Sequence, residues 1–224
     1  MAIFVSASGL KDYLSCTKML EYRIFHKEKA EPSIDQLVGS VAHKIFECAW
    51  QDEETAIEFA EKECKQINLG RVDTGRVFGF IPNFFSSFRS LLSEEDKIEY
   101  MFKLKLMDNV FLVGKIDRIS GGNIFDWKTA RRPPSRLDTD VQFILYHFAY
   151  KTLFSKEPTG IYYGALSTGE LVRYNHNEKY EELLLKSLLP KMIFDISQQN
   201  FQRDGLFKKS CYRCNYKKDC LKDY

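Results

Sequence analysis

The chain lacks several features that would place a protein in a membrane or outside the cell. None of its hydrophobic runs approaches the roughly 20 residues needed to cross a bilayer. Its first residues hold no basic segment followed by an apolar stretch, so we expect no secretory signal, an intracellular, cytoplasmic location and no membrane partner. Internal repeats and low-complexity linkers are also missing, and the 224 residues are therefore expected to form a single domain over 1–224.

An excess of charge of one sign is missing as well. Lysine and arginine number 33 against 31 acidic residues, a net charge of +2, so any surface that binds nucleic acid has to be local. Hydrophobic residues at 44% and charged residues at 29% are ordinary for a globular protein. In a protein expected to be intracellular, the six cysteines are expected to be thiols or metal ligands instead of disulfides.

Hydrophobic patterns predict an α/β domain. Helical spacing predicts helices over 8–26, from residue 33, and over 53–66, 80–92, 140–154 and 178–200, the last broken at Pro190. Alternation predicts strands over 98–107, 110–119, 123–129, 160–166 and 170–174. Ser8 is the expected N-cap of the first helix, and Ser33 with Gln36 the capping box of the second. Helices followed by a β-meander, a helix and two return strands are typical of one α/β domain.

Two consecutive glycines predict a short hairpin. Gly121 and Gly122 separate two runs of alternating apolar residues, and both tolerate the positive φ angles of a two-residue turn. In that register Asp117 lies directly opposite Asp126, with Cβ atoms about 4.5–5.5 Å apart. Lys128 follows Asp126 by two residues and therefore projects from the same face of the strand.

These three charged side chains indicate a metal site for phosphate chemistry. Two carboxylates so placed repel each other, and Mg²⁺ prefers such oxygen ligands together with substrate phosphate. A solvated hairpin face with ordinary charges is the alternative. The half-buried character of the flanking residues and of Trp127 counts against that alternative.

Two helices carry further candidates at four-residue spacing. Gly39, His43 and Glu47 share one face, where Gly39 would let another backbone approach closely and His43 is a candidate metal ligand. A surface or core histidine is the alternative, and Glu47 is either an acid behind the ligands or a solvated side chain. Gln142 and Tyr146 share a face of a later helix, for which a purely structural amphipathic helix is the alternative.

Four cysteines are candidates for one metal site. Cys211, Cys214 and Cys220 are closely spaced, and Cys16 lies near the other end of the sequence. Such a set satisfies a four-thiolate site for either zinc or an iron–sulfur cluster, and spacing does not decide between them. Unligated thiols among lysines are the alternative, although such thiols invite oxidation. The other two cysteines fall on predicted helices and are expected to be ordinary buried or half-buried thiols.

Basic residues gather in two places. Arg131 and Arg132, with Arg136, follow the hairpin, and a second set stands among the terminal cysteines, interleaved with aromatic residues: Lys208, Lys209, Lys217 and Lys218. Basic groups with aromatics suit single-stranded nucleic acid, because lysines neutralise phosphates while rings stack on bases. A charged, solvated tail is the alternative.

Together these motifs resemble the PD-(D/E)XK nucleases, specifically the RecB-like branch with an iron–sulfur cluster. That branch occurs in AddB-type subunits and in the CRISPR-associated exonuclease of spacer acquisition. The resemblance rests on five elements in the family's order: Cys16, Gly39 to Glu47, Gly114 to Thr129, Gln142 to Tyr146, and the terminal cysteines. It implies a restriction-endonuclease-like core, a mixed central sheet flanked by helices over 33–175, with 1–30 and 205–224 joined by a metal cluster.

The resemblance also implies a role for each motif. His43, Asp117 and Asp126 are implied ligands of Mg²⁺ or Mn²⁺, and Lys128 is implied to position water or stabilise transition-state charge. Gln142 and Tyr146 are implied to lie near substrate phosphates or bases. The four implied ligands of a [4Fe-4S] cluster are Cys16, Cys211, Cys214 and Cys220.

The implied activity is metal-dependent exonucleolytic cleavage of DNA, with single strands favoured, in repair, recombination, phage or CRISPR-adaptation settings. A Gly-x-x-x-x-Gly-Lys-Ser/Thr loop for ATP is absent, so any unwinding would come from a helicase partner; CRISPR-adaptation proteins are the other implied partners. Two alternatives remain: a non-catalytic iron–sulfur subunit that binds DNA in a larger nuclease–helicase complex, and a zinc-stabilised nucleic-acid binder.

Overall fold

A computed structural model describes residues 2–26, 32–48, 51–130, 132–206, 208–212 and 214–222. Its helices are α1 (Ala7–Ser15), α2 (Thr17–Phe25), α3 (Ile34–Cys48), α4 (Glu53–Gln66), α5 (Arg71–Ser87), η1 (Arg89–Leu91), α6 (Val141–Phe154), α7 (Glu178–Leu183), the π-helical turn η2 (Leu184–Leu188), α8 (Leu189–Ser197), α9 (Lys209–Tyr212) and α10 (Lys217–Lys222). Its strands are β1 (Ile3–Val5), β2 (Lys97–Met107), β3 (Val110–Ser120), β4 (Asn123–Lys128), β5 (Gly160–Ala165) and β6 (Glu170–Arg173). Within these ranges no helix is both long and apolar enough to span a bilayer.

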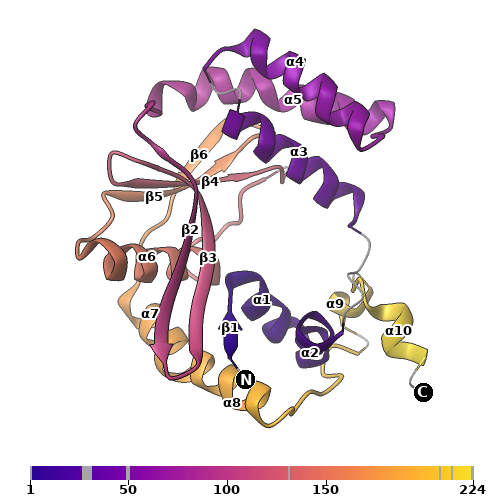
Figure 1. Ribbon diagram of the computed structural model, residues 1–224, viewed down its shortest axis with the longest axis vertical. Helices are drawn as coiled ribbons and strands as arrows, with labels where there is room; N and C mark the ends of the chain where they lie inside the picture. The colour runs from indigo at the N-terminus through magenta and orange to yellow at the C-terminus, as the bar shows by residue number, and fades with distance from the viewer. Residues whose placement is uncertain are drawn as a thin grey trace.

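A mixed six-stranded sheet forms the centre of the molecule (Figure 1). Strand β3 pairs along one edge with antiparallel β2. Its other edge is shared, because β1 runs parallel to its first residues and β4 runs antiparallel to its last ones. Strand β5 lies parallel to β4, and β6 antiparallel to β5. This mixed sheet flanked by helices confirms the predicted fold class.

Helices cover the sheet in two groups, each with its own hydrophobic core (Figure 1). Helices α3, α4 and α5 enclose one core, to which β4 contributes Phe125 and Trp127. Helices α1, α6 and α8 enclose the other core, which takes Ile124 from β4. Because side chains alternate along a strand, Asp126 faces the side of α6, while its neighbours on either side face α3 and α5.

The prediction of one helix over 8–26 is wrong, because the structure has two helices there, α1 and α2. Helix α1 begins after Ser6, whose hydroxyl accepts a hydrogen bond from the Gly9 amide at 3.2 Å, so the N-cap is Ser6 and not the predicted Ser8. Cys16 separates α1 from α2 in extended backbone, with φ −171° and ψ 120°. The apolar spacing continues across this break, which is why the pattern alone does not reveal it.

The remaining elements follow the predictions closely, with four exceptions, of which the first is that the short helices α9 and α10 were not predicted. Strand β1 was not predicted, because three residues are too few to show an alternation. Helix α5 begins at Arg71, nine residues before the predicted start, although Gly75 and Gly79 lower its helix propensity. The last helix continues through Pro190 and contains the π-helical turn η2. The capping box is confirmed, since the Gln36 amide donates to Ser33 Oγ at 3.3 Å and the Ser33 amide to Gln36 Oε1 at 2.8 Å.

Candidate active site

The predicted hairpin is present in the predicted register. Gly121 and Gly122 form its turn with φ of 54° and 86°, and Arg118 pairs with Phe125. The ladder ends there, one residue before Asp117 and Asp126 would face each other. The Trp127 amide donates to Asp117 Oδ2 at 2.8 Å in place of a backbone carbonyl of β3. The two aspartates therefore lie where β3 and β4 separate.

Burial rules out the solvated hairpin face. Asp126 is 1% exposed and Asp117 8% exposed. Trp127, on the opposite face of β4, is also buried, and its ring centroid lies 5.5 Å from that of Phe84 and 5.2 Å from that of Phe88. Charged side chains at such depth are rare unless they are paired or bind a metal.

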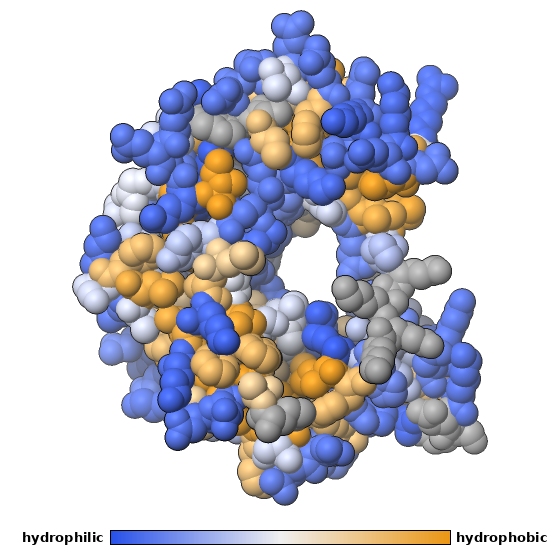
Figure 2. All heavy atoms as spheres, in the orientation of Figure 1, coloured by the Kyte–Doolittle hydropathy of each residue, from blue (hydrophilic) through white to orange (hydrophobic). Residues whose placement is uncertain are grey.

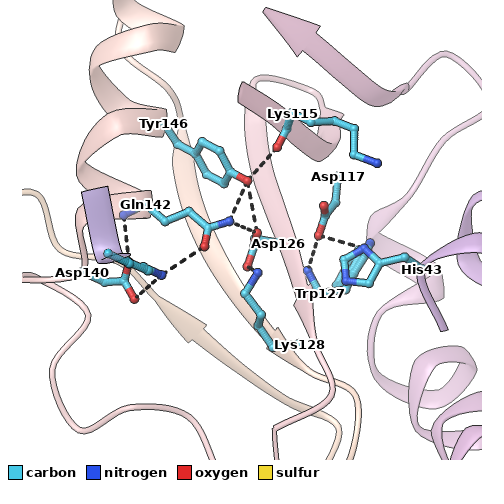
Figure 3. Close-up of polar contacts among 10 residues, drawn as sticks. His43, Lys115, Asp117, Asp126, Trp127, Lys128, Asp140, Gln142 and Tyr146 are labelled. Atoms are coloured by element: carbon cyan, nitrogen blue, oxygen red, sulfur yellow. Dashed lines mark hydrogen bonds and ion pairs between the residues drawn. The ribbon is translucent and has the colours of Figure 1, made fainter. Parts of the chain in front are cut away.

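Asp126 is bound by three side chains (Figure 3). Lys128 Nζ lies 2.5 Å from its Oδ2, and Gln142 Nε2 donates to its Oδ1 at 2.8 Å. The Tyr146 hydroxyl lies 3.3 Å from the same Oδ1. Burial raises the pKa of the Asp126 carboxyl, and repulsion from Asp117 raises it further, against the opposing charge of Lys128.

Tyr146 occupies a gap in the sheet. Strands β1 and β4 pair with opposite ends of one edge of β3 and leave residues 113–117 between them. The Tyr146 hydroxyl donates to the Lys115 carbonyl in this gap at 2.7 Å and accepts from Gln142 Nε2 at 2.8 Å. Burial raises its pKa well above the usual value, and so does the negative charge of Asp126, so the phenol is held in its neutral form.

Asp117 forms a second group with His43 on α3. Its Oδ2 lies 3.5 Å from His43 Nδ1. Burial favours the neutral carboxyl, but the charges of His43 and Lys128 prevail and hold the pKa of Asp117 below its usual range. Burial likewise works against the charged imidazole, and the charge of Asp117 outweighs it, so the pKa of His43 is raised.

Glu99 on β2 completes a set of possible metal ligands that the sequence patterns did not predict. One ligand atom each from His43, Glu99 and Asp117 lie within 4.8 Å of one another. Glu99 Oε1 is buried and has no hydrogen-bond partner among the described residues, while the carboxylate also contacts Lys115. Two carboxylates and an imidazole suit Mg²⁺ or Mn²⁺. This set holds two of the three predicted ligands, and Asp126 stands outside it with Lys128 and Gln142.

A β-bulge explains why Glu99 was missed. The turn between β2 and β3 pairs Met107 with Val110, and an unbroken register from there would set Tyr100 opposite Asp117. The register shifts between Lys105 and Met107, so that Ile98 pairs with Arg118 and Tyr100 with Ile116. Glu99 therefore falls opposite Asp117, with a φ of 48°. No local sequence pattern predicts this change in the register of β2 against β3.

Two further polar residues support the site, and neither was predicted. Lys11 Nζ on α1 donates to Gln142 Oε1 at 3.2 Å and lies 3.1 Å from Asp140 Oδ1. Asp140 caps α6 by accepting from the Gln142 amide at 2.8 Å. Lys11 therefore fixes which end of the Gln142 amide faces Asp126.

Residues around His43 differ in part from their predictions. Glu47 lines a cavity with His43, Glu99 and Asp117, and burial raises its pKa. Among the described residues, a Cβ added at Gly39 would meet only Thr129 Oγ1, at 3.7 Å, which is an ordinary contact. The close backbone approach expected at Gly39 is therefore absent from the described structure.

The four predicted cysteines come together around one cavity. Cys16, between α1 and α2, lines it with Cys211, Cys214 and Cys220. Burial raises the pKa of the Cys214 thiol, and the three other thiols add to that shift. Outside this group, Cys64 is buried as predicted, whereas Cys48 is exposed.

Contacts between the two ends of the chain surround these cysteines. The Lys18 amide donates to the Gln202 carbonyl at 3.0 Å, and the Thr17 amide to Asp204 Oδ1 at 2.9 Å. A Cβ on Gly205 would come within 2.7 Å of Cys16 Cβ, so only glycine lets the chain pass there without a shift. Arg203 Nε donates to Cys220 Sγ at 3.3 Å.

The predicted basic residues are only partly free to bind a phosphate. Arg132 is exposed and Arg131 lies outside the described residues. Arg136 pairs with Asp138 at 2.8 Å and donates to the Tyr180 hydroxyl at 2.9 Å, so it does not extend the patch. In the terminal set, Lys208, Lys209 and Lys218 are exposed, and Lys217 Nζ lies 5.2 Å from the Tyr212 ring centroid.

Comparison with known proteins identifies the family. The family model of the PD-(D/E)XK nuclease superfamily matches residues 5–221. No curated protein matches the chain. A solved structure described as "Crystal structure of SSO0001" is 16% identical over 93% of this chain and 92% of that chain, with a TM-score of 0.37, and we base no argument on it. On the match over nearly its whole length, the chain belongs to the PD-(D/E)XK nuclease superfamily.

Proposed function

We propose that this protein is a metal-dependent DNA exonuclease of the RecB-like type that carries a [4Fe-4S] cluster. The observation that carries the nuclease proposal is the meeting of Asp117, Asp126 and Lys128 where β3 separates from β4. His43 reaches this point from α3, and Gln142 reaches it from α6. Superfamily membership supports nuclease activity; the substrate, the mode of cleavage and the branch are parts of the proposal.

The residues present fit a divalent cation. Asp117, His43 and Glu99 are close enough to share one, and Asp126, the third ligand predicted from the sequence, stands beside them with a raised pKa that an added cation would lower. Bound there, Mg²⁺ or Mn²⁺ would polarise the scissile phosphate and lower the pKa of a water.

The protein's own groups have separate tasks in this proposal. Lys128, held 2.5 Å from Asp126, supplies positive charge for the phosphorane and positions the attacking water. Gln142 and Tyr146 orient the Asp126 carboxylate through the hydrogen bonds described above. The neutral Tyr146 hydroxyl donates a hydrogen bond to the Lys115 carbonyl and keeps its proton, so it takes no part in acid–base catalysis.

The shape of the molecule supports a single strand as substrate. Figure 2 shows an opening near the middle of the molecule, and in Figure 1 this position lies beside α3, β3 and α1. These elements carry His43, Asp117 and Lys11, respectively. A cavity of about 210 Å³ lined by Lys11, Lys115 and Gln142 adjoins the site. Arg132 and the terminal lysines Lys208, Lys209 and Lys218 are exposed and would neutralise phosphates of the bound strand.

The cluster is proposed from the four cysteines that share one cavity. It would join 1–30 to 205–224 and hold them against the catalytic core over 33–175, so that 1–224 forms one nuclease domain. Zinc is the alternative occupant, because four thiolates suit either. Purified protein that is colourless and contains zinc without iron would replace the cluster in this proposal and leave the nuclease site untouched.

A degradation assay tests the proposed activity. End-labelled single- and double-stranded DNA is incubated with Mg²⁺ or Mn²⁺, with a chelator as control, using wild type, Asp117→Asn and Lys128→Met. We expect metal-dependent loss of nucleotides from ends of single strands in wild type only. A circular single strand separates exonuclease from endonuclease, since only an endonuclease cuts it.

The second candidate is a DNA-binding subunit without catalysis, in a larger complex with a helicase or CRISPR-adaptation proteins. The buried pair of Asp126 and Lys128 argues against this candidate. A buried carboxylate with a raised pKa is typical of a catalytic site and is not required for binding DNA. Binding of DNA by wild type with no cleavage under any metal would establish this candidate and exclude the first.

A further inference from the structure

The hairpin of β2 and β3 has one covered face and one open face, because side chains alternate along each strand. In β2, Phe102 is buried in the core that α1, α6 and α8 enclose, whereas Met101 is 79% exposed and Lys103 is also exposed. In β3, Leu112 is buried in the same core, whereas Lys115 is exposed. With one residue of β1, the open face consists of Phe4, Met101, Lys103, Phe111, Val113 and Lys115.

The open face begins with a pair of aromatic rings. Phe4 lies opposite Phe111 in the parallel pairing of β1 with β3, and the two rings stack with centroids 5.7 Å apart. Phe4 is 52% exposed. Lys103 Nζ lies 4.2 Å from the Phe111 ring centroid and 5.1 Å from that of Phe4. In the described part of the chain Lys103 forms no ion pair with a carboxylate, so its flexible side chain is held only by the rings.

The open face leads to the proposed metal site. Met101 lies opposite Lys115 in the pairing of β2 with β3. The Lys115 ammonium contacts the Glu99 carboxylate, and one ligand atom of Glu99 lies within 4.8 Å of those of His43 and Asp117. A row of neighbouring side chains therefore connects the ring pair with the candidate metal ligands.

The chemistry of the open face fits a single strand of DNA. Aromatic rings stack on bases whose faces are free, which a single strand offers and a duplex does not. Lysines on the same face neutralise phosphates. From Phe111 to Asp117 the distance along β3 is about 20 Å, at roughly 3.3 Å per residue, and a few nucleotides span it.

A second copy of this chain suits the open face less well. In a two-fold interface the same patch of both subunits meets, so Lys103 of one copy would approach Lys103 of the other. Like charges brought together in this way repel, whereas a polyanion neutralises them.

We propose that the open face binds the single-stranded DNA substrate and guides it into the nuclease site. A base stacks at Phe4, while Lys103 leaves the rings for one phosphate and Lys115 binds another beside the metal ligands. This role rests on the proposed nuclease function, because it assigns the path of that substrate, but binding itself does not require cleavage.

Affinity for a labelled oligodeoxythymidylate tests this role. It is measured by fluorescence anisotropy with the purified protein, without added Mg²⁺ or Mn²⁺. The variants of the open face are Phe4→Ala, Phe4→Tyr and Lys103→Met. Phe194→Ala is the matched control for the ring, since Phe194 is 61% exposed on α8, and Lys62→Met is the control for the charge, since Lys62 is exposed on α4. Calorimetry checks that each variant keeps the Tm of wild type.

We expect Phe4→Ala to weaken binding roughly 5- to 150-fold, because one base loses its stacking partner. Phe4→Tyr keeps the ring and should keep the affinity of wild type. Lys103→Met should make the slope of log affinity against log salt shallower by about 0.7. In cleavage, Phe4→Ala should raise KM and leave kcat unchanged, and both controls should match wild type throughout.

Wild-type affinity in Phe4→Ala together with an unchanged salt slope in Lys103→Met would overturn the proposal. So would a dimeric wild type that becomes monomeric in Phe4→Ala with no change in DNA affinity, because the open face would then join two copies. Wild type that binds the strand through this face but cleaves no DNA with any metal would support the open face and refute the proposed nuclease activity.

Discussion

Removal of one hydroxyl, in Tyr146→Phe, tests the network that orients Asp126. The hydroxyl is buried with the 4% exposed Tyr146 side chain, donates to the Lys115 carbonyl at 2.7 Å and accepts from Gln142 at 2.8 Å. Loss of the hydroxyl leaves the Lys115 carbonyl and one N–H of the Gln142 side-chain amide without these hydrogen-bond partners. Buried groups left unpaired cost about 1–3 kcal/mol. For a chain of this size that free energy lowers the Tm by roughly 2–12 °C.

Activity should fall as well, because Gln142 loses one of the contacts that fix its amide against Asp126. If 1.4 kcal/mol of this orientation is lost in the transition state, kcat falls about tenfold while binding of DNA stays the same. Calorimetry measures the Tm, and steady-state cleavage of labelled DNA separates kcat from KM.

Tyr174→Phe is the matched control for this experiment. Tyr174 is also 4% exposed, and within the described part of the chain its hydroxyl makes no hydrogen bond of ordinary geometry, although it lies near the Asn177 amide. Its removal should change the Tm by no more than about 1–2 °C. Equal Tm values for the two variants, with kcat unchanged in both, would refute the proposed role of the Tyr146 hydroxyl.

Three further predictions follow from the site and the cysteines. Cys16→Ala should lose all iron and melt about 10 °C lower, because the cluster closes a loop of about 195 residues, worth about 5 kcal/mol; exposed Cys48→Ser should change neither quantity, and full iron content in Cys16→Ala would contradict the four-cysteine site. In metal-free protein the raised pKa of His43 stabilises the fold below its unfolded pKa of about 6.5, and this stabilisation is lost as pH rises through the raised value. The Tm advantage of wild type over His43→Gln should therefore shrink as pH rises above about 6.5, and a growing advantage would reverse the assigned sign. The last prediction concerns the four terminal lysines, Lys208, Lys209, Lys217 and Lys218. Replacing them together should make the slope of log affinity against log salt shallower by up to about 0.7 per lost contact. An unchanged slope would mean that the DNA strand binds elsewhere on the protein.

Local signals account for what the sequence predicted correctly. The hairpin depends on two glycines and a count of alternating residues, so its register follows from the sequence alone. The capping box at Ser33 and Gln36 is equally local. Residues on one helix face, such as Gln142 and Tyr146, need only the period of the helix to be placed together.

The residues that were missed depend on contacts between distant segments. Lys11 reaches Gln142 only because α1 packs beside α6, and no pattern within either helix shows this. Glu99 depends on a bulge that shifts the register of β2 by one residue. The break at Cys16 depends on the segment around Gln202 and Asp204: the Lys18 amide donates to the Gln202 carbonyl, and the Thr17 amide donates to the Asp204 carboxylate. Propensity and period carry no information on such pairings.

The shared edge of β3 has a consequence for the order in which the protein folds. Strands β2, β3 and β4 are neighbours in the chain and close only short loops, whereas β1 pairs with residues more than a hundred positions away. Short-range pairings form sooner, because less chain entropy is lost. We therefore expect β2, β3 and β4 to bring Asp117 close to Asp126 before α3 and α6 pack against the sheet. Only then would the side chains of these helices, such as His43 and Gln142, contact the two aspartates. Pulsed hydrogen exchange should show early protection in β2 and β3 and late protection in β1, with the charged pair solvated in between.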